Sequence, residues 1–231
     1  GVIAGHVWTE RPAGYVAVSA GPVMAAADRW RGTVRVQGGH GAMPHQTVDP
    51  IVASAQVVSS IQSIVSRNVG PMETAVVTVG TFQGGDAFNV VPANVELSGT
   101  IRTFDALVRA HVVARLHALC SGVAEAYGGS AELEVDSLTP AVVNDAEVTE
   151  VVRRAAIAVL GDEYVLSGER TTGSEDASFF MQDVPGCFFF MGSADPSKEV
   201  NAPHHNPAFD VDEKVLVVGV SVIAQAVADY L

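Results

Sequence analysis

Residues 95–129, VELSGTIRTFDALVRAHVVARLHALCSGVAEAYGG, contain a strand pattern followed directly by a helix pattern. In 95–103, Val, Leu, Gly and Ile alternate with polar residues, which is the period of a half-buried strand. Asp105 is a suitable N-cap for the next helix, and Gly128 with Gly129 is suited to end it. The helix has an apolar stripe of Val108, Val112, Leu116, Leu119, Val123 and Tyr127. This stretch therefore predicts the strand and helix of an α+β unit.

The flanking sequence predicts the rest of that unit. A strand pattern at 33–37 precedes a helix that Asp49 caps, with Pro50 in its first position and Gly70-Pro71 after its end. Further strands are predicted at 75–81 and 131–135. The order strand, helix, strand, strand, helix, strand is the ferredoxin-like pattern, in which two helices cover one face of a four-stranded sheet.

The second face of the predicted sheet carries the polar residues of strand 95–103, which are Glu96, Ser98, Thr100 and Arg102. An exposed sheet face or edge is commonly covered by another copy of the chain. We therefore expect a homodimer that forms through this unit.

The remaining sequence predicts parts of a second, larger domain. Residues 1–23 end in Ser-Ala-Gly-Pro and resemble the last piece of a preceding segment. After Thr139-Pro140, a helix at 148–160, an apolar strand at 187–191 and a C-terminal helix suggest α/β alternation. We expect residues 24–137 to be inserted between two segments of an α/β domain, 1–23 and 138–231.

Composition excludes several classes of protein. Hydrophobic residues make up 48% of the 231 residues and charged residues 17%, which is typical of a packed globular protein. The net charge of −13 disfavours a nucleic-acid partner. The apolar stretch 215–228 is interrupted and shorter than the ~20 residues of a membrane span, so we expect no membrane segment.

We also expect a cytoplasmic protein. Cys120 and Cys187 are predicted to be reduced core thiols.

Three segments that contain histidine are candidates for metal binding or catalysis. His6 follows a short apolar strand beside Trp8, where it could bind a metal or simply pack. His40 lies in a glycine-rich loop that permits close approach of a ligand, although a plain turn also explains the glycines. His204 and His205 are adjacent in a proline-bounded loop, so at most one of them is expected to serve a given site.

Two further candidate segments have no histidine. Arg102, together with Asn89 in Phe-Asn-Val-Val-Pro, is suited to a carboxylate, while an ion pair with Glu96 is an equally good explanation of the arginine. Segment 172–176, Thr-Gly-Ser-Glu-Asp, could bind metal or substrate, or its Ser174 or Asp176 could cap a short helix.

Taken in order, these segments resemble the metal-dependent amidohydrolases that include aminoacylase, hippurate hydrolase, indoleacetyl-amino-acid hydrolases and carboxypeptidase G. The matching blocks are Gly5-His6-Val7-Trp8; 39–45 (GHGAMPH) with Asp49-Pro50-Ile51; 88–92 (FNVVP); Gly99-Thr100-Ile101-Arg102; Gly173-Ser174-Glu175-Asp176; 185–192 (PGCFFFMG); and His205-Asn206-Pro207 with Phe209-Asp210. The resemblance implies the second half of a phosphorylase/hydrolase-like zinc-peptidase catalytic domain of the α/β class, with an inserted α+β ferredoxin-like lid and dimerisation domain.

The resemblance also implies roles for individual residues. His6 and His205 correspond to metal ligands, for two zinc or manganese ions in the full-length enzyme. His40 corresponds to the lid histidine that enters the partner subunit's active site and stabilises the oxyanion. Asn89 and Arg102 correspond to residues that hold the substrate's carboxylate, and the loop with Gly173, Ser174 and Glu175 corresponds to one that lines the pocket. The substrate class implied is an N-acyl amino acid or a small peptide-like amide.

The family's early Cys-and-His block and its adjacent glutamate pair, a ligand and the general base, have no match in this sequence. We therefore expect this chain to be a fragment with an incomplete metal site, inactive by itself. Two alternatives remain open. The chain could be a non-catalytic dimerisation module, or a ferredoxin-like domain that binds amino acids on the polar face of its sheet.

Overall fold

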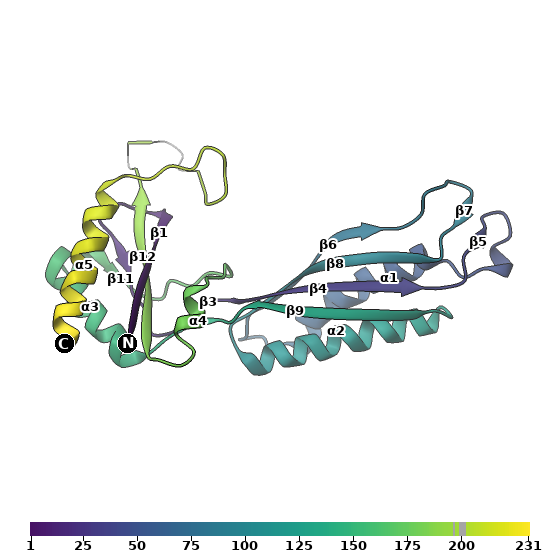
Figure 1. Ribbon diagram of the computed structural model, residues 1–231, viewed down its shortest axis with the longest axis horizontal. Coiled ribbons are helices and arrows are strands. Elements are labelled where there is room, and N and C mark those ends of the chain that lie inside the picture. The colour runs from purple at the N-terminus through teal and green to yellow at the C-terminus, as the bar shows by residue number, and fades with distance from the viewer. Residues whose placement is uncertain (196, 199–201) are drawn as a thin grey trace. The chain divides into compact units, whose positions relative to one another are not determined.

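The computed structural model describes residues 1–195, 197–198 and 202–231 (Figure 1). The chain divides into two compact units. Residues 1–24 and 141–231 form the first, here called the discontinuous unit, and residues 25–140 form the second, here called the inserted unit. Both units contain strands and helices, which confirms the mixed α/β class.

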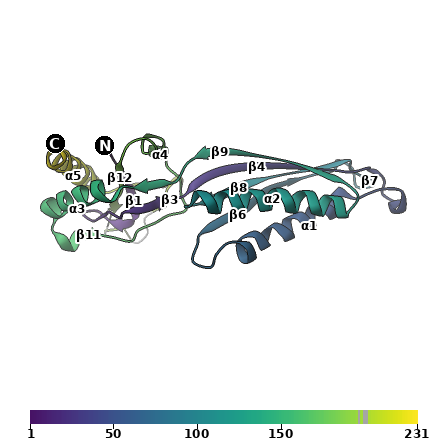
Figure 2. The same ribbon diagram turned by 90° about the horizontal axis from the view of Figure 1, so that it is seen from below.

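The inserted unit is built on a four-stranded antiparallel sheet with the strand order β6-β8-β4-β9. Its main elements are β4 (Ala26–Arg35), α1 (Pro50–Ser63), β6 (Ala75–Gln83), β8 (Asn94–Thr103), α2 (Ala106–Ala126) and β9 (Ser130–Thr139). Helices α1 and α2 lie side by side on one face of the sheet (Figure 2). This is the strand order of a ferredoxin-like unit.

Sequence periodicity explains these elements. On β8, Val95, Leu97 and Ile101 are buried in the core, whereas the polar residues between them face away from it. The side chain of Asp105 accepts hydrogen bonds from the backbone N–H groups of residues 107 and 108, at 2.7 and 2.9 Å, and so caps α2. Helix α2 ends where Gly128 takes a φ of 81°. The predicted cap and stop of α2 are confirmed.

Two boundaries in the inserted unit differ most from the prediction. Strand β4 begins at Ala26, seven residues before the predicted start at Thr33. The alternation does not predict the first part of β4, because the charged residue Asp28 occupies a core-facing position there. Its carboxylate pairs with Arg109 of α2. Helix α1 ends at Ser63 and continues as a π-helical turn over 64–68, whereas the prediction extended it to Gly70.

The outer face of the sheet has rows of opposite charges. Arg29 and Arg31 of β4 pair with Asp136 of β9, and Arg35 pairs with Glu132. Such cross-strand pairs stabilise the register of neighbouring strands. The polar face predicted from strand 95–103 is confirmed, and charges of both signs line it.

The discontinuous unit contains a mixed four-stranded sheet with the order β1-β12-β2-β11. Its strands and main helices are β1 (Val2–Pro12), β2 (Val16–Ala17), β11 (Val165–Leu166), β12 (Gly186–Ala194), α3 (Ala146–Leu160), α4 (Ala177–Phe180) and α5 (Lys214–Tyr230). Helices α3 and α5 pack against each other and against β12 (Figure 1). A two-stranded sheet of β3 (Gly21–Met24) and β10 (Val142–Asn144) completes the unit.

Strand β12 is the centre of this unit's core. Cys187 and Phe189 pack with α3 and α5, while Phe188 and Phe190 fill a second cluster on the opposite face. Because both faces are covered, the strand is a continuous apolar run without alternation. Cys187 and Cys120 are both free and buried, as predicted.

None of the helices in the described residues is long and apolar enough to cross a membrane.

Candidate functional site in the discontinuous unit and a candidate histidine in the inserted unit

His6 lies within β1 and not at its end, because the strand continues to Pro12. It pairs in register with Phe190 of β12. Its ring nitrogen Nδ1 lies 2.7 Å from the carbonyl oxygen of Val7. A carbonyl can only accept, so Nδ1 carries the proton and Nε2 of the neutral ring keeps a free lone pair. This is the arrangement that prepares a histidine for metal binding.

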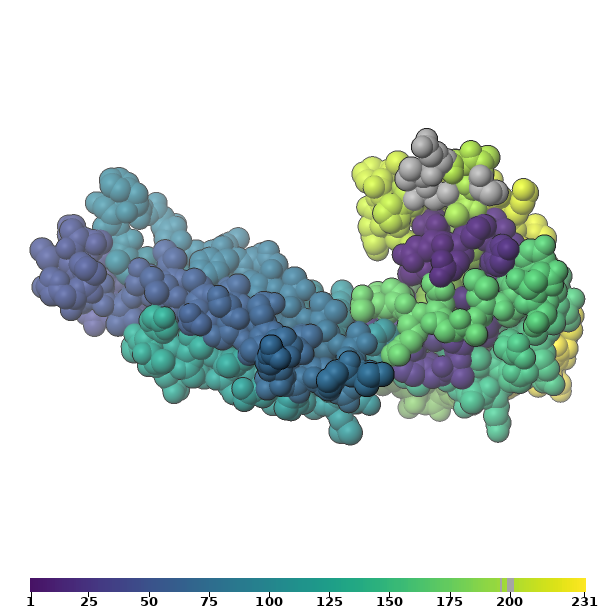
Figure 3. Space-filling model, turned by 180° about the vertical axis from the view of Figure 1, so that it is seen from behind, coloured from purple at the N-terminus to yellow at the C-terminus, as the bar shows by residue number. Residues whose placement is uncertain are grey.

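His204, and not His205, packs beside His6. Its Nε2 lies 2.9 Å from the same carbonyl oxygen of Val7, and the two imidazole centroids are 5.2 Å apart. The ring of His204 also contacts Trp8 at 4.9 Å and Phe209 at 5.0 Å. In Figure 3, the yellow-green atoms of this loop lie beside the purple atoms of β1. The sequence offered no signal for choosing between the two adjacent histidines.

His205 is exposed and has a φ of 66°, the left-handed region that non-glycine residues seldom occupy. Such a conformation costs about 1–3 kcal/mol and is concentrated at functional sites. A metal-binding role for His205 stays a prediction.

Glu175 approaches His6 from the loop that precedes α4. Its Oε2 lies 3.9 Å from Nε2 of His6, and its side chain is 21% exposed. Burial raises the pKa of this carboxyl above its ordinary value, and the neighbouring Asp176 adds to the effect. Asp176 occupies the N-cap position of α4, but its side chain makes no capping hydrogen bond, so the capping explanation of this segment is wrong for Asp176.

Gly173 and Ser174 are half-buried in the same loop. Gly173 donates a hydrogen bond of 3.1 Å to the hydroxyl of Thr171. The loop is thus ordered immediately before Glu175, and a pocket-lining role for both residues stays a prediction.

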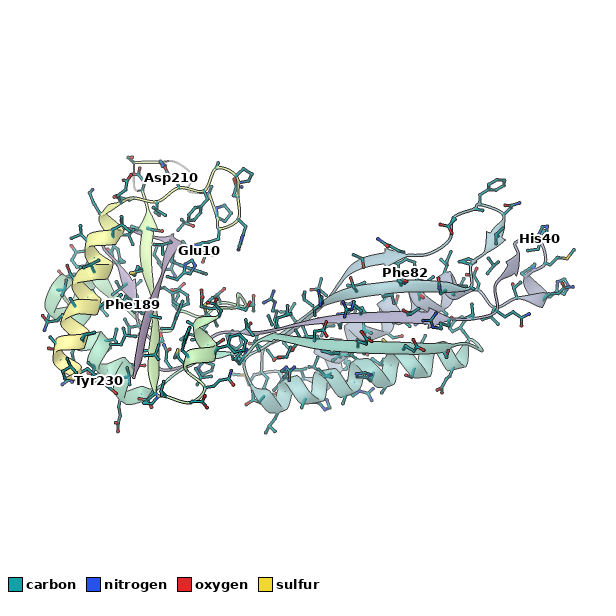
Figure 4. The ribbon with its side chains drawn as sticks, in the orientation of Figure 1. Glu10, His40, Phe82, Phe189, Asp210 and Tyr230 are labelled. Atoms are coloured by element: carbon teal, nitrogen blue, oxygen red, sulfur yellow. The ribbon has the colours of Figure 1, made fainter. Side chains whose placement is uncertain are left out.

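In the inserted unit, β5 (Gly39–His40) and β7 (Val90–Val91) form a two-stranded antiparallel sheet, here called the β5/β7 sheet, and Asn89 immediately precedes β7. Gly41 donates a backbone hydrogen bond of 2.9 Å to the carbonyl of Asn89, and a Cβ on Gly41 would lie 2.8 Å from that oxygen. The close approach of the two backbones therefore explains this glycine. Figure 4 shows the exposed His40 at the far end of the inserted unit.

The tautomer of His40 follows from its local hydrogen bond. Its Nδ1 accepts a hydrogen bond of 3.0 Å from the backbone N–H of Ala42. The neutral ring must then carry its proton on Nε2. His40 thus presents a hydrogen-bond donor at the exposed edge of its ring.

Arg102 lies at the opposite end of β8 from the β5/β7 sheet. It pairs in register with Ala27 and Val76, whereas the β5/β7 sheet adjoins the other end, where the N–H of Val36 donates to the carbonyl of Ala93. The strand from Asn94 to Arg102 spans about 26 Å. Glu96 is about 20 Å from Arg102 by the same measure, which excludes the ion pair considered for these two residues.

Within the part of the chain that the structure describes, no three His, Cys, Asp or Glu side chains gather closely enough to hold a metal ion. His6 and Glu175 form a pair of suitable donors. The donor set therefore fits part of a metal site, which further ligands would have to complete.

Comparison with known proteins identifies the family. The model of peptidase family M20/M25/M40 matches residues 1–229.

The chain belongs to peptidase family M20/M25/M40.

Its relatives in this family include two Bacillus subtilis proteins. The YhaA protein is 39% identical over 97% of this chain, and an N-acetylcysteine deacetylase is 34% identical over 95% of it. The matches cover 57% and 56% of those proteins, so the chain spans a little over half the length of these relatives.

Two solved structures have the same fold. A protein from methicillin-resistant Staphylococcus aureus superposes on the whole chain with a TM-score of 0.91 at 33% identity, and 59% of that protein is covered. The YXEP protein of Bacillus subtilis, described as a dinuclear metal-binding peptidase of the M20 family, has a TM-score of 0.81 at 29% identity; the match covers 99% of this chain and 56% of YXEP.

Proposed function

We propose that this chain is part of a metal-dependent amidohydrolase that cleaves the amide bond of N-acyl amino acids or small peptide-like substrates. The observation that carries the proposal is the free Nε2 of His6 beside Glu175, in a chain of the M20/M25/M40 family. The names of the relatives, a deacetylase of N-acetylcysteine among them, support the substrate class.

In this proposal, two divalent ions, zinc or manganese, are bound by His6, by His205 and by residues from outside this chain. Ions of this kind lower the pKa of a bound water and polarise the amide carbonyl. Two histidines by themselves bind metal weakly and without selectivity. The other ligands and a general-base glutamate therefore have to come from a further part of the enzyme.

His40 has a defined part in the proposed reaction. Its tautomer leaves Nε2–H free to donate a hydrogen bond to the oxygen that becomes negative in the transition state. Loss of such a donor typically lowers the rate by about 10²–10³-fold. We therefore expect His40→Ala to abolish measurable turnover while metal content is unchanged.

The positions of Asn89 and Arg102 favour a site shared between two subunits. A carboxylate is only a few ångströms wide, and the two residues are separated by about the length of β8. One inserted unit cannot bring both to the same carboxylate. In the proposed homodimer, Arg102 of one subunit and Asn89 with His40 of the other share one site, and the Gly173–Glu175 loop lines it.

A chimaeric enzyme tests the proposed function. Residues 1–231 replace the matching part of the Bacillus subtilis N-acetylcysteine deacetylase, and release of cysteine from N-acetyl-L-cysteine is measured with zinc, with manganese and with a chelator. We expect metal-dependent hydrolysis that His40→Ala abolishes. A folded chimaera that binds metal but hydrolyses neither N-acetyl nor N-benzoyl amino acids would reject the proposal.

The two non-catalytic alternatives make different predictions. A dimerisation module would associate without binding metal at His6, and an amino-acid-binding domain would bind free amino acids without metal. Metal analysis and calorimetry with amino acids distinguish both from the hydrolase. The arginines of β4 on the polar sheet face are already paired with acids of β9, which leaves them less available for the carboxylate of an amino acid.

A further inference from the structure

We propose that Glu175 is itself a metal ligand that shares one ion with Nε2 of His6. The inference rests on the proposed function, because it assumes that His6 binds metal. It assigns Glu175 a role in metal binding in addition to its place in the pocket-lining loop.

The geometry of the carboxylate supports this role. One oxygen, Oε1, accepts a hydrogen bond of 3.1 Å from the backbone N–H of Asp176, while Oε2 lies 3.9 Å from Nε2 of His6. That separation is beyond hydrogen-bond range. A zinc ion about 2.0–2.2 Å from each donor bridges a gap of up to about 4 Å. The two atoms are therefore too far apart for a direct hydrogen bond and close enough to reach one ion.

The loop that carries Glu175 is bound to β1, the strand that carries His6. Glu169 of this loop accepts two hydrogen bonds from Nη2 of Arg11, at 2.8 and 3.1 Å, and Arg11 belongs to β1. The N–H of Thr171 donates to the carbonyl of Val23 at 3.0 Å. Both proposed donors are thus positioned relative to one strand before any ion arrives.

The surroundings favour binding of an ion over solvation of the carboxylate. Trp8 lies with its ring centroid 6.2 Å from that of His6, and Trp8 packs on Phe190 at 4.8 Å. These rings restrict water on one side of His6, and the side chain of Glu175 is itself only 21% exposed. A carboxylate in such a place gains more from a cation than an exposed one does.

Zinc titration of the 231-residue chain, followed by long-range ¹H–¹⁵N correlation spectra of the imidazoles, tests the inference. The spectra identify the tautomer of His6 and report binding at its Nε2, separately from the surface histidines. We expect the His6 signals to move with zinc in the wild type. In Glu175→Gln, which keeps the shape of the side chain, we expect the same shift to require about tenfold more zinc.

Asp183→Asn is the control, because it removes an exposed carboxylate that follows α4 and should leave the titration unchanged. A Glu175→Gln variant that retains the wild-type spectrum without zinc, and titrates like the wild type, would overturn the role of Glu175 and leave that of His6 intact. A wild-type His6 signal that does not move with zinc would overturn both this inference and the metal role in the proposed function.

Discussion

At the scale of single residues, Gly99 permits close packing in the core of the inserted unit. This glycine lies on β8, and a Cβ in its place would collide with the carbonyl oxygen of Thr78 and lie 2.7 Å from Nε1 of Trp30. The indole of Trp30 donates a hydrogen bond of 3.1 Å to that same carbonyl and is fully buried. The alternation in the sequence predicted that Gly99 faces the core, but it did not predict that Trp30 packs against it.

We predict that Gly99→Ala destabilises the chain by about 3 kcal/mol, because backbone and a buried tryptophan cannot both move away. Gly122→Ala is the control. Gly122 is exposed on α2, and a Cβ there would have no heavy atom of another residue within 4 Å, so alanine should stabilise by about 0.5–1 kcal/mol. Urea unfolding curves measure both changes. Equal effects of the two substitutions would contradict the packing argument.

The two cysteines permit a chemical test of the cores. Burial raises the pKa of the Cys120 and Cys187 thiols to about 11 in each case. Because the reactive form is the thiolate, both groups should stay protonated and inert well above neutral pH. We expect iodoacetamide at pH 8 to leave the folded chain unmodified and to alkylate two sites in denaturant, as mass spectrometry measures. Rapid alkylation of either thiol in the folded chain would show that its core is open.

For single residues of the candidate site, the sequence predicted functional residue types but not the contacts between them. His6, His40 and Glu175 have side chains that can bind metal or transfer protons. The sequence could not show that His204 packs on His6, that both rings bond the carbonyl of Val7, or that Glu175 approaches Nε2. The contacts that His204 and Glu175 make with β1 join segments far apart in the sequence, and no local pattern encodes them.

At the scale of elements, periodicity and capping residues predicted α2 and β8 well, because one polar and one apolar face give each element a clear period. Strand β4 was predicted too short because Asp28 breaks its apolar alternation. The carboxylate of Asp28 is fully buried and accepts two hydrogen bonds from Nε and one from Nη2 of Arg109, at 2.7–3.0 Å. A single ion pair therefore joins the first strand of the inserted unit to α2.

We predict that Arg109→Met destabilises the chain by about 3 kcal/mol, since it leaves a buried carboxylate without its cation. Arg115→Met on the same helix is the control, because Arg115 makes one long hydrogen bond of 3.4 Å at an exposed site; a change below about 0.5 kcal/mol is expected there. Thermal unfolding followed by circular dichroism distinguishes the two variants. Similar melting temperatures would mean that the Asp28–Arg109 pair contributes little.

At the scale of the whole molecule, the sequence predicted an α/β chain with a ferredoxin-like order of elements, because each unit follows its own hydrophobic pattern. The assembly of the site from two subunits is a proposal that no pattern within one chain could establish. It depends on the separation of the β5/β7 sheet, which carries His40, from Arg102 along β8, and that separation appears only when the strands are paired in register.

The central claim is that one active site combines His6 of one subunit with His40 of the other, and mixed dimers test it most directly. His6→Ala and His40→Ala versions of the chimaeric enzyme, each expected to be inactive, are produced together in equal amounts. Half of the dimers are then mixed, and one of the two sites in each mixed dimer keeps both histidines. We predict about a quarter of the wild-type rate of amide hydrolysis. No activity from a preparation shown to contain mixed dimers would contradict the claim.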